Sequence, residues 1–303
     1  MPGGRSYYSP HHSQRPGHLV LCPLPCPRPS PPGQQTAGPG QGAGDLAGIT
    51  YSHGSSNAAA LATRSMALIH EMLRDLVLEQ GCSPPPDDCA APLLKTLLAH
   101  SASWDSVPPS LANRELPERY RLIGYGEAEL ARVLSCTDQR VTLIGWGMIR
   151  AGEAHAYDVP LPDALASVVG WRRLTITLGW LTPTLPSHQK YRQAILWLTD
   201  YWTPKTVEGR DLLNVSRQAE YQTVRRGTLQ HEVFEGNRVA GYEAAAVLPL
   251  QVNCAEDAGH FDEAIPYGVA ATLEVAPELG VEIYEEIRAR IRQPVLVQSR
   301  GPA

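Results

Sequence analysis

The sequence lacks any long apolar run. No stretch of its 303 residues approaches the run of about 18 apolar residues that is needed to span a bilayer. The basic, Pro-rich N-terminus also has no apolar block of signal-peptide length. We therefore expect a soluble, cytoplasmic protein, which would be exported only if a missing N-terminal segment carried a signal.

Two further absences exclude classes of partner and cofactor. The chain has no cluster of Lys and Arg, and its formal net charge is -5. Binding to nucleic acid or to an anionic membrane needs a basic patch, so we expect neither partner. The spacings Cys22-x3-Cys26 and Cys82-x6-Cys89 are not those of paired zinc knuckles. We therefore expect reduced thiols, no metal and no other cofactor.

The first 45 residues hold 10 Pro and 8 Gly. Proline has no backbone N–H to donate, and this segment shows no hydrophobic periodicity. We therefore expect residues 1–45 to be a flexible arm that forms neither helix nor sheet ladder. The chain as a whole is 43% hydrophobic, which is enough to bury real cores in the remaining residues.

Helical periodicity follows the arm, within residues 46–135. One helical face carries Leu61, Leu68, Ile69, Met72 and Leu76. Gly81 is a plausible residue to end this helix. The first two turns are small and apolar all round, so we expect the start of the helix to lie deep in the fold. A second helix is expected to open at Pro92, and a turn at 124–126 leads into a third, short helix.

The period changes to two beyond about residue 138. Residues 173–178 alternate polar and apolar side chains, as expected of a strand with one face on a core and one in water. Similar strands are expected at 141–146, 154–159, 194–198, 246–253 and 269–275. Short strands without intervening helices predict an all-β antiparallel sandwich over residues 136–303. A short C-terminal helix is expected at its end, where Ile283, Ile287 and Ile291 recur every four residues.

Ser56 is the strongest candidate for a reactive side chain. It lies where a loop rich in Gly and Ser meets the N-terminus of the first helix. Unpaired N–H groups and the positive end of the helix dipole at that position can stabilise the anion that forms when a carbonyl is attacked. The residues alone leave a second interpretation open, in which Ser55 or Ser56 is the N-cap of the helix.

The segment 54–60, with the sequence GSSNAAA, resembles the nucleophile motif of the subtilisin-like serine proteases, the subtilases. Their pattern is Gly-Thr-Ser-Met-Ala-x-Pro, and Ser56 occupies the position of the catalytic serine. The sequence departs from this pattern at Ser55, Asn57 and Ala60. Pro2-Gly3-Gly4 also resembles the Ala-Pro-Gly segment that precedes the serine in that family.

This resemblance implies a serine endopeptidase that acts on a polypeptide substrate. Ser56 would be the nucleophile and its backbone N–H an oxyanion donor, while Gly54 and Ser55 would bind the substrate. Residues 46–135 would be part of an α/β catalytic domain, because the helices and the turn at 124–126 look like its C-terminal third. Residues 136–303 look more distantly like the β-sandwich accessory domains that follow some subtilase domains.

The family also needs an Asp and a His upstream of its serine. The 55 residues before Ser56 contain one Asp, Asp45, and no His at the start of a helix. We therefore expect a truncated α/β catalytic remnant that is inactive alone. A separate chain that supplies the missing catalytic half is a further expected partner.

Two alternatives remain open. An α/β-hydrolase would use Gly54-x-Ser56-x-Ala58 as its nucleophile elbow, with Asp257 and His260 completing the set. The expected architecture opposes it, since such an elbow follows a core strand. The second alternative is a non-catalytic binding or interaction protein in which the β-sandwich is the working part. Its support is the missing Asp and His.

Overall fold

The structure is a computed structural model, and it describes most of the chain. The described residues are 7–12, 19–24, 33–40, 42, 44, 47–198, 216–218, 226–239, 241–291 and 296–297. They divide into two compact units, residues 1–64 and 65–303. The domain boundaries expected near residues 45 and 135 stay predictions. Within the described residues, no helix is long and apolar enough to cross a membrane.

The N-terminal unit contains two small antiparallel pairs of strands. They are β1 (Tyr7–His12) with β2 (Leu19–Leu24), and β3 (Gln34–Gly38) with β4 (Gly48–Ser52). The prediction that residues 1–45 form no sheet ladder is therefore wrong. A two-stranded ladder consists of edge strands alone, and an edge strand tolerates proline. Pro10 and Pro23 accordingly lie within β1 and β2.

The helices precede the large sheets. They are α1 (Ser55–Gln80), α2 (Asp87–His100), α3 (Pro109–Ala112), α4 (Leu116–Ile123) and α5 (Ala131–Leu134). α1 ends directly before Gly81, as predicted. The prediction that the second helix opens at Pro92 is wrong, because α2 begins at Asp87. Asp87 and Asp88 favour the positive end of the helix dipole, and Pro92 is accommodated one turn later.

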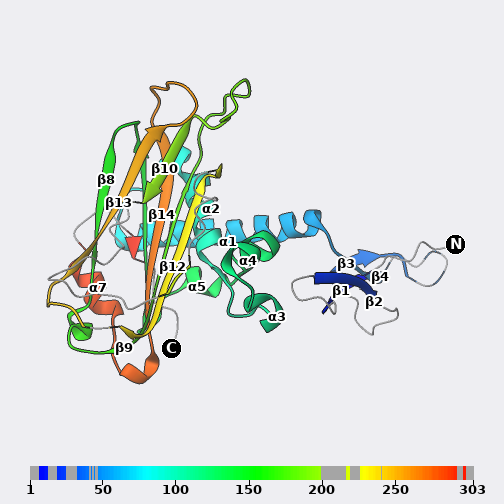
Figure 1. Cartoon of the computed structure of the whole chain (residues 1–303), viewed down its shortest axis with the longest axis horizontal. Coiled ribbons are helices and arrows are strands. Elements are labelled where there is room, and N and C mark those ends of the chain that lie inside the picture. The colour runs from blue at the N-terminus through cyan, green and yellow to red at the C-terminus, as the bar shows by residue number, and fades with distance from the viewer. Residues whose placement is uncertain are drawn as a thin grey trace. The chain divides into compact units, whose positions relative to one another are not determined.

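The C-terminal unit contains two large antiparallel sheets (Figure 1). One has the strand order β11-β12-β9-β14-β7-β15 and the other the order β10-β13-β8. Their bounds are β7 (Arg140–Ile149), β8 (Ala154–Pro160), β9 (Gly170–Trp180), β10 (Ala194–Leu198), β11 (Ser216–Gln218), β12 (Leu229–Val239), β13 (Val247–Glu256), β14 (Ile265–Val275) and β15 (Leu296–Val297). All six strands predicted from the sequence are present, and the sheet-rich fold is confirmed.

The two sheets contribute side chains to one hydrophobic core. Its largest fully buried members are Trp180 and Tyr267 from the six-stranded sheet. Leu196 and Val252 come from the three-stranded sheet. A short helix, α7 (Tyr284–Arg290), packs Tyr284 and Ile287 against the same core, close to where the sequence predicts a terminal helix.

The opposite face of the six-stranded sheet is covered by helices. A second hydrophobic core joins Ile144 and Ala270 of the sheet to Leu93 and Leu97 of α2 and to the second half of α1. The prediction that the polar face of residues 173–178 meets water is therefore wrong. Thr175 and Thr177 are 4% and 0% exposed. Threonine is small and can hydrogen-bond to a covering helix, so its alternation does not by itself indicate solvent.

Candidate functional site

Ser56 lies in the first turn of α1. The C=O group of Gly54 accepts the first helical hydrogen bond, from the N–H of Ala58 at 3.1 Å, so Gly54 is the N-cap residue. Ser55 and Ser56 therefore lie inside the helix, and neither acts as its N-cap. Gly54 has a φ of 145°, a conformation that favours glycine, although a Cβ there would meet no atom within 4 Å. Backbone conformation is thus the reason for glycine before the two serines.

The surroundings of Ser56 differ from the expectation. Ser55 and Ser56 are both exposed, as are Ala58 to Ala60, and Leu61 is 47% exposed. The prediction that the start of this helix lies deep in the fold is therefore wrong. The buried residues of α1 lie in its second half, where Ile69, Leu73, Leu76 and Val77 join the second core. Small apolar side chains allow another element to pack closely against a helix. Whether such an element is present depends on the rest of the fold.

The hydrogen bonds around Ser56 hold the turn but provide no base. Asn57 Nδ2 donates to Ser52 Oγ at 2.9 Å and to Gln34 Oε1 at 3.4 Å, which ties α1 to β3 and β4. Among the described residues, no His or carboxylate side chain hydrogen-bonds Ser56 Oγ. Asp45 lies outside the described residues. The site thus presents an accessible hydroxyl and the first-turn N–H groups of a helix, with no base hydrogen-bonded to the hydroxyl within the described residues.

Asp257 and His260, the other two residues of the hydrolase alternative, do not form a pair. Asp257 accepts from Arg192 Nε at 2.9 Å. His260 instead contacts Glu256 Oε1 at 2.5 Å and Asp262 Oδ1 at 3.0 Å. The hydrogen bond to Glu256 raises the pKa of His260 above its ordinary value. An imidazole held by two exposed carboxylates and oriented by neither Asp257 nor a buried group lacks the arrangement of a catalytic dyad.

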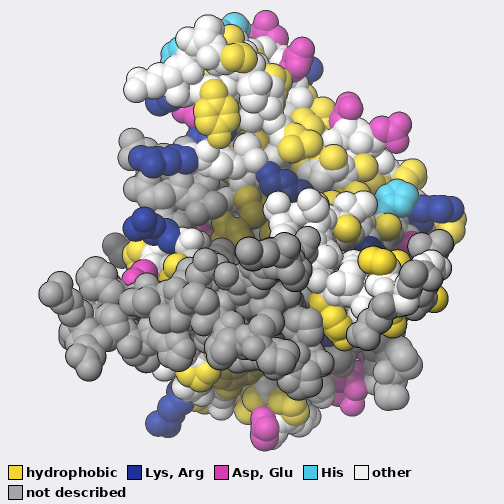
Figure 2. Space-filling view, turned by 90° about the vertical axis from the view of Figure 1, so that its right-hand side faces the viewer, with side chains coloured by type: hydrophobic (Ala, Val, Ile, Leu, Met, Phe, Trp, Pro, Cys, Tyr) yellow, Lys and Arg dark blue, Asp and Glu magenta, His cyan; other side chains and the backbone are white. Residues whose placement is uncertain are grey.

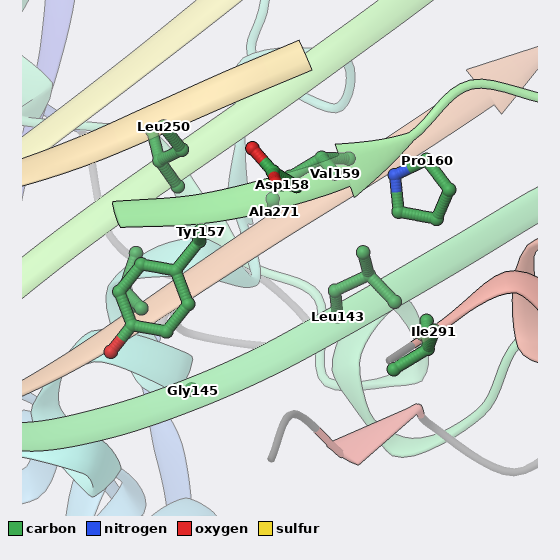
Figure 3. Close-up of a pocket in the computed structure, with 10 residues that line it drawn as sticks. Leu143, Gly145, Tyr157, Asp158, Val159, Pro160, Leu250, Ala271 and Ile291 are labelled. Carbon is green, nitrogen blue, oxygen red and sulfur yellow. The ribbon is translucent and has the colours of Figure 1, made fainter. Parts of the chain in front are cut away.

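An apolar cavity within the C-terminal unit is too small for a substrate. It has a volume of about 30 Å³ and is bordered by Leu143, Tyr157, Leu250 and Ile291 (Figure 3). This is roughly the share of one water molecule in the liquid. The cavity is therefore a packing defect between strands rather than a binding site.

The sequence does not predict the buried polar chain beneath α2. His100 of α2 contacts Thr177 Oγ1 through Nδ1 at 2.8 Å and Thr272 Oγ1 through Nε2 at 2.6 Å. Thr177 Oγ1 also contacts His231 Nδ1 at 2.7 Å, and Thr272 Oγ1 contacts Thr142 Oγ1 at 2.7 Å. Five side chains from one helix and four strands thus share one hydrogen-bonded chain. The sequence signal for this hydrogen-bonded chain is the alternation of threonine within residues 173–178, which on its own predicts a strand face in contact with water.

The described part of the chain contains no cluster of side chains suited to bind a metal ion. No group of three or more His, Cys, Asp or Glu side chains there could hold an ion. The cysteines with described side chains are free thiols, namely Cys82, Cys89, Cys136 and Cys254. On the face drawn in Figure 2, the described Lys and Arg side chains are scattered among acidic and apolar ones.

Comparisons with known proteins add no family. Neither the models of protein families nor the curated protein sequences give a match to this chain. The geometry and chemistry of the chain's own residues therefore carry the functional argument.

Proposed function

We propose that this chain is part of a subtilisin-like serine endopeptidase in which Ser56 is the nucleophile. The observation that carries the proposal is the local geometry of the motif. Ser56 is an exposed hydroxyl in the first turn of a 26-residue helix, two residues after a glycine with positive φ. A nucleophile at this position has first-turn N–H groups beside it, whose partial positive charge favours an oxyanion.

The reaction proceeds by acyl transfer. Ser56 Oγ attacks the carbonyl carbon of the scissile peptide while a histidine takes the hydroxyl proton. The tetrahedral oxyanion accepts a hydrogen bond from the backbone N–H of Ser56. The C–N bond then breaks, the histidine gives its proton to the leaving amine, and water releases the acyl group from Ser56. Gly54 and Ser55 lie beside the bound substrate.

The histidine and its orienting aspartate come from another polypeptide segment in this proposal. Support comes from the exposed first turns of α1, where Ala58, Ala59 and Leu61 present apolar surface. A helix that is apolar all round is normally buried on every side. A segment that covers these turns would both bury this surface and bring a base to Ser56.

Residues 136–303 are proposed to be a β-sandwich accessory domain. The shared core of the six-stranded and three-stranded sheets supports this assignment. A non-catalytic binding protein built on the same sheets is the second candidate. The observation that favours it is that no base hydrogen-bonds Ser56 within the described residues.

A fluorophosphonate probe, which labels activated serines, tests the nucleophile. We expect no labelling of this chain alone and clear labelling of a version extended at its N-terminus by a segment that carries the histidine and the aspartate. Ser56→Ala should abolish that labelling. Thr63→Ala is the matched control, because it removes an exposed hydroxyl about two turns further along the same helix and should leave labelling in place. An extended chain that is not labelled, or is labelled equally after Ser56→Ala, would contradict the proposal and favour the binding protein.

A further inference from the structure

A pocket of about 260 Å³ lies in the C-terminal unit, on the helix-covered face of the six-stranded sheet. Strands β9 and β12 form its floor, and α4, α5 and the segment after β5 (Ala102–Ser103) form its walls. Three arginines and three aromatic residues line the pocket, and we call it the arginine pocket. They are Arg119, Arg132, Arg173, Trp104, Tyr120 and Tyr125. The serine motif contributes no residue to it.

The acidic side chains of the pocket are already paired with Arg173. Asp105 accepts from Arg173 Nη1 and Nη2 at 2.8 and 3.1 Å, the two-pronged geometry of a guanidinium on a carboxylate. Glu235 accepts from Arg173 Nε at 2.9 Å and from Trp171 Nε1 at 3.0 Å. Although burial alone would raise it, the pKa of Asp105 is held below its ordinary value by these Arg173 hydrogen bonds. Arg173 is therefore neutralised by Asp105 and Glu235.

Arg132 likewise has an acidic partner, because its Nη2 pairs with Glu274. His231, on the floor, adds no charge at neutral pH. Burial, together with the positive charge of Arg132, lowers the pKa of His231 to about 4. The charges of the pocket are thus accounted for apart from that of Arg119.

Arg119 is held in place, but its charge is not paired. Its Nε donates to the backbone C=O of Arg114 at 2.8 Å, and its guanidinium lies 4.6 Å from the centroid of the Trp104 ring. The Trp104 ring is itself fixed by a hydrogen bond from Nε1 to the C=O of Gly124 at 3.2 Å. In the described parts of the chain, no carboxylate lies within 4 Å of Arg119. Its terminal nitrogens are left with unused donors.

An aromatic wall stands next to this guanidinium. The Tyr120 ring packs against Trp104 with centroids 5.1 Å apart and against Tyr125 with centroids 5.5 Å apart, both edge to face. Tyr125 in turn packs 4.9 Å from His231. The pocket therefore combines a flat apolar surface with one prealigned cation, and such a combination recognises a flat group that carries an anion.

We propose that the arginine pocket binds a carboxylate attached to a flat apolar group. The carboxylate lies on the free donors of Arg119, whose planar guanidinium matches it with two parallel hydrogen bonds. The ring of the ligand lies against Tyr120 and Tyr125. Two sources share this chemistry, namely the C-terminal aromatic residue of a peptide and a free aromatic acid. The pocket has room for one such residue, since a water molecule takes roughly 30 Å³. The proposal does not depend on Ser56.

Titration calorimetry on the full chain with three probes tests the ligand chemistry. The probes are N-acetylglycylphenylalanine, its C-terminal amide and phenylacetate. We expect the free acid to bind about tenfold or more tightly than the amide, as charge-assisted hydrogen bonds predict. If phenylacetate binds as tightly as the peptide acid, the pocket is assigned to small aromatic acids. If phenylacetate binds more weakly, the pocket is assigned to peptide C-termini. Equal affinity for acid and amide, or no binding of either acid, would overturn the proposal.

Variants of α4 test the assigned residue. Arg119→Gln should weaken binding of the peptide acid about tenfold or more. The affinity of Arg119→Lys should lie between those of the unaltered chain and Arg119→Gln, because lysine keeps the charge and loses the planar guanidinium. Arg121→Gln is the matched control, since Arg121 is exposed on the same helix and does not line the pocket. An equal loss in Arg121→Gln would reduce the effect to general charge attraction and overturn the assignment. The comparison of acid with amide on the unaltered chain holds even if Arg119→Gln fails to fold.

Discussion

Ser56 and Arg119 are polar side chains whose positions are fixed by their backbone or neighbours while their reactive atoms keep unused hydrogen-bonding capacity. Ser56 is placed by the first turn of α1, and Arg119 by Trp104 and the C=O of Arg114. His231 shows the opposite case, because it is buried and its Nδ1 is bonded to Thr177. Accessible groups with free hydrogen-bonding capacity, such as the exposed Ser56 and the half-buried Arg119, are suited to a ligand, whereas the buried imidazole affects the stability of the fold.

His231 makes stability depend on pH below neutrality. Its pKa is lowered by burial to about 4, whereas an unfolded histidine titrates near about 6.5. The unfolded state therefore binds more protons between these values, and stability falls as pH drops through this window. From pH 7 to pH 5 we expect this residue to lower the free energy of unfolding by about 2 kcal/mol. Burial also lowers the pKa of His100, which adds to the loss in the same direction.

Urea unfolding at pH 7 and pH 5 measures this loss. The matched variant is His231→Gln, which keeps an amide able to reach Thr177 but does not titrate. Its unfolding free energy should change less between the two pH values than that of the unaltered chain. The same pH dependence in both proteins would rule out His231 as the cause.

Gly54 is predicted to control the start of α1. Gly54→Ala places a side chain at a φ of 145°, which we expect to cost about 1 kcal/mol or more at this turn, although no atom is close enough to clash. The N–H of Ala58, which donates to the C=O of Gly54, should then exchange with deuterium about fivefold faster or more. Unchanged exchange at Ala58 would show that the turn does not require glycine.

At the scale of elements, α2 is the helix that meets the six-stranded sheet most closely. A Cβ added to Gly268 of β14 would lie 2.7 Å from Cα of Leu93, and one added to Gly179 of β9 would lie 2.5 Å from Oγ1 of Thr96. Thr96 Oγ1 also donates to the C=O of Gly268 at 3.1 Å. The two glycines therefore set the distance at which helix and sheet pack.

Gly268→Ala should push α2 away from the sheet. The nearest atom belongs to the helix backbone, so a rotamer change cannot relieve the contact. We expect a loss of about 1 to 3 kcal/mol in the free energy of unfolding, measured with urea. Ala154→Val is the control, because it adds more atoms on the exposed side of β8 and should change stability by about 0.5 kcal/mol or less. Equal effects of the two substitutions would contradict the packing argument.

Whether a helix or strand can be predicted from the sequence depends on what its polar residues contact. The six predicted strands have apolar residues at every second position, and all are present. β12 is not predicted, because Gln230, His231 and Glu232 interrupt its pattern, yet these side chains are at most 5% exposed. His231 bonds to Thr177 of the neighbouring strand, and Gln230 accepts from the N–H of Leu198. Such tertiary partners leave no trace in local periodicity.

The candidate sites differ in the same way. The serine motif is contiguous, so the sequence places Ser56 at a helix start correctly, but its exposure depends on which element covers α1. The arginine pocket joins Trp104, Arg119 and Glu235, which are more than a hundred positions apart at the extremes. No local pattern unites these residues, and a fold is needed to find them.

At the scale of the whole C-terminal unit, the six-stranded sheet packs on both faces. One face shares a core with the three-stranded sheet and the other with α1, α2 and α5. A fragment of residues 136–303, which the sequence predicts to fold alone, would expose the second face, including Thr142, Thr177 and Ala270. This prediction therefore needs a comparison with the longer fragment 65–303.

We expect residues 65–303 to unfold cooperatively and at higher urea concentration than residues 136–303. The physical reason is that α2 buries Leu93 and Leu97 on the sheet and supplies His100 to the polar chain. Circular dichroism during urea unfolding checks both fragments. Equal midpoints would show that the helices add no stability, and would place the boundary near residue 136.

The position of β14 also has a consequence for synthesis on the ribosome. β7 and β9 do not pair with each other, and each pairs with β14, which lies between them and is made more than 80 residues after β9 ends. The large sheet therefore cannot close until residues 265–275 have left the exit tunnel. Until then the facing edges of β7 and β9 lack their partner, and open edges invite contacts with other chains. A nascent chain of this protein is thus most exposed to aggregation in the interval between the release of β9 and the release of β14.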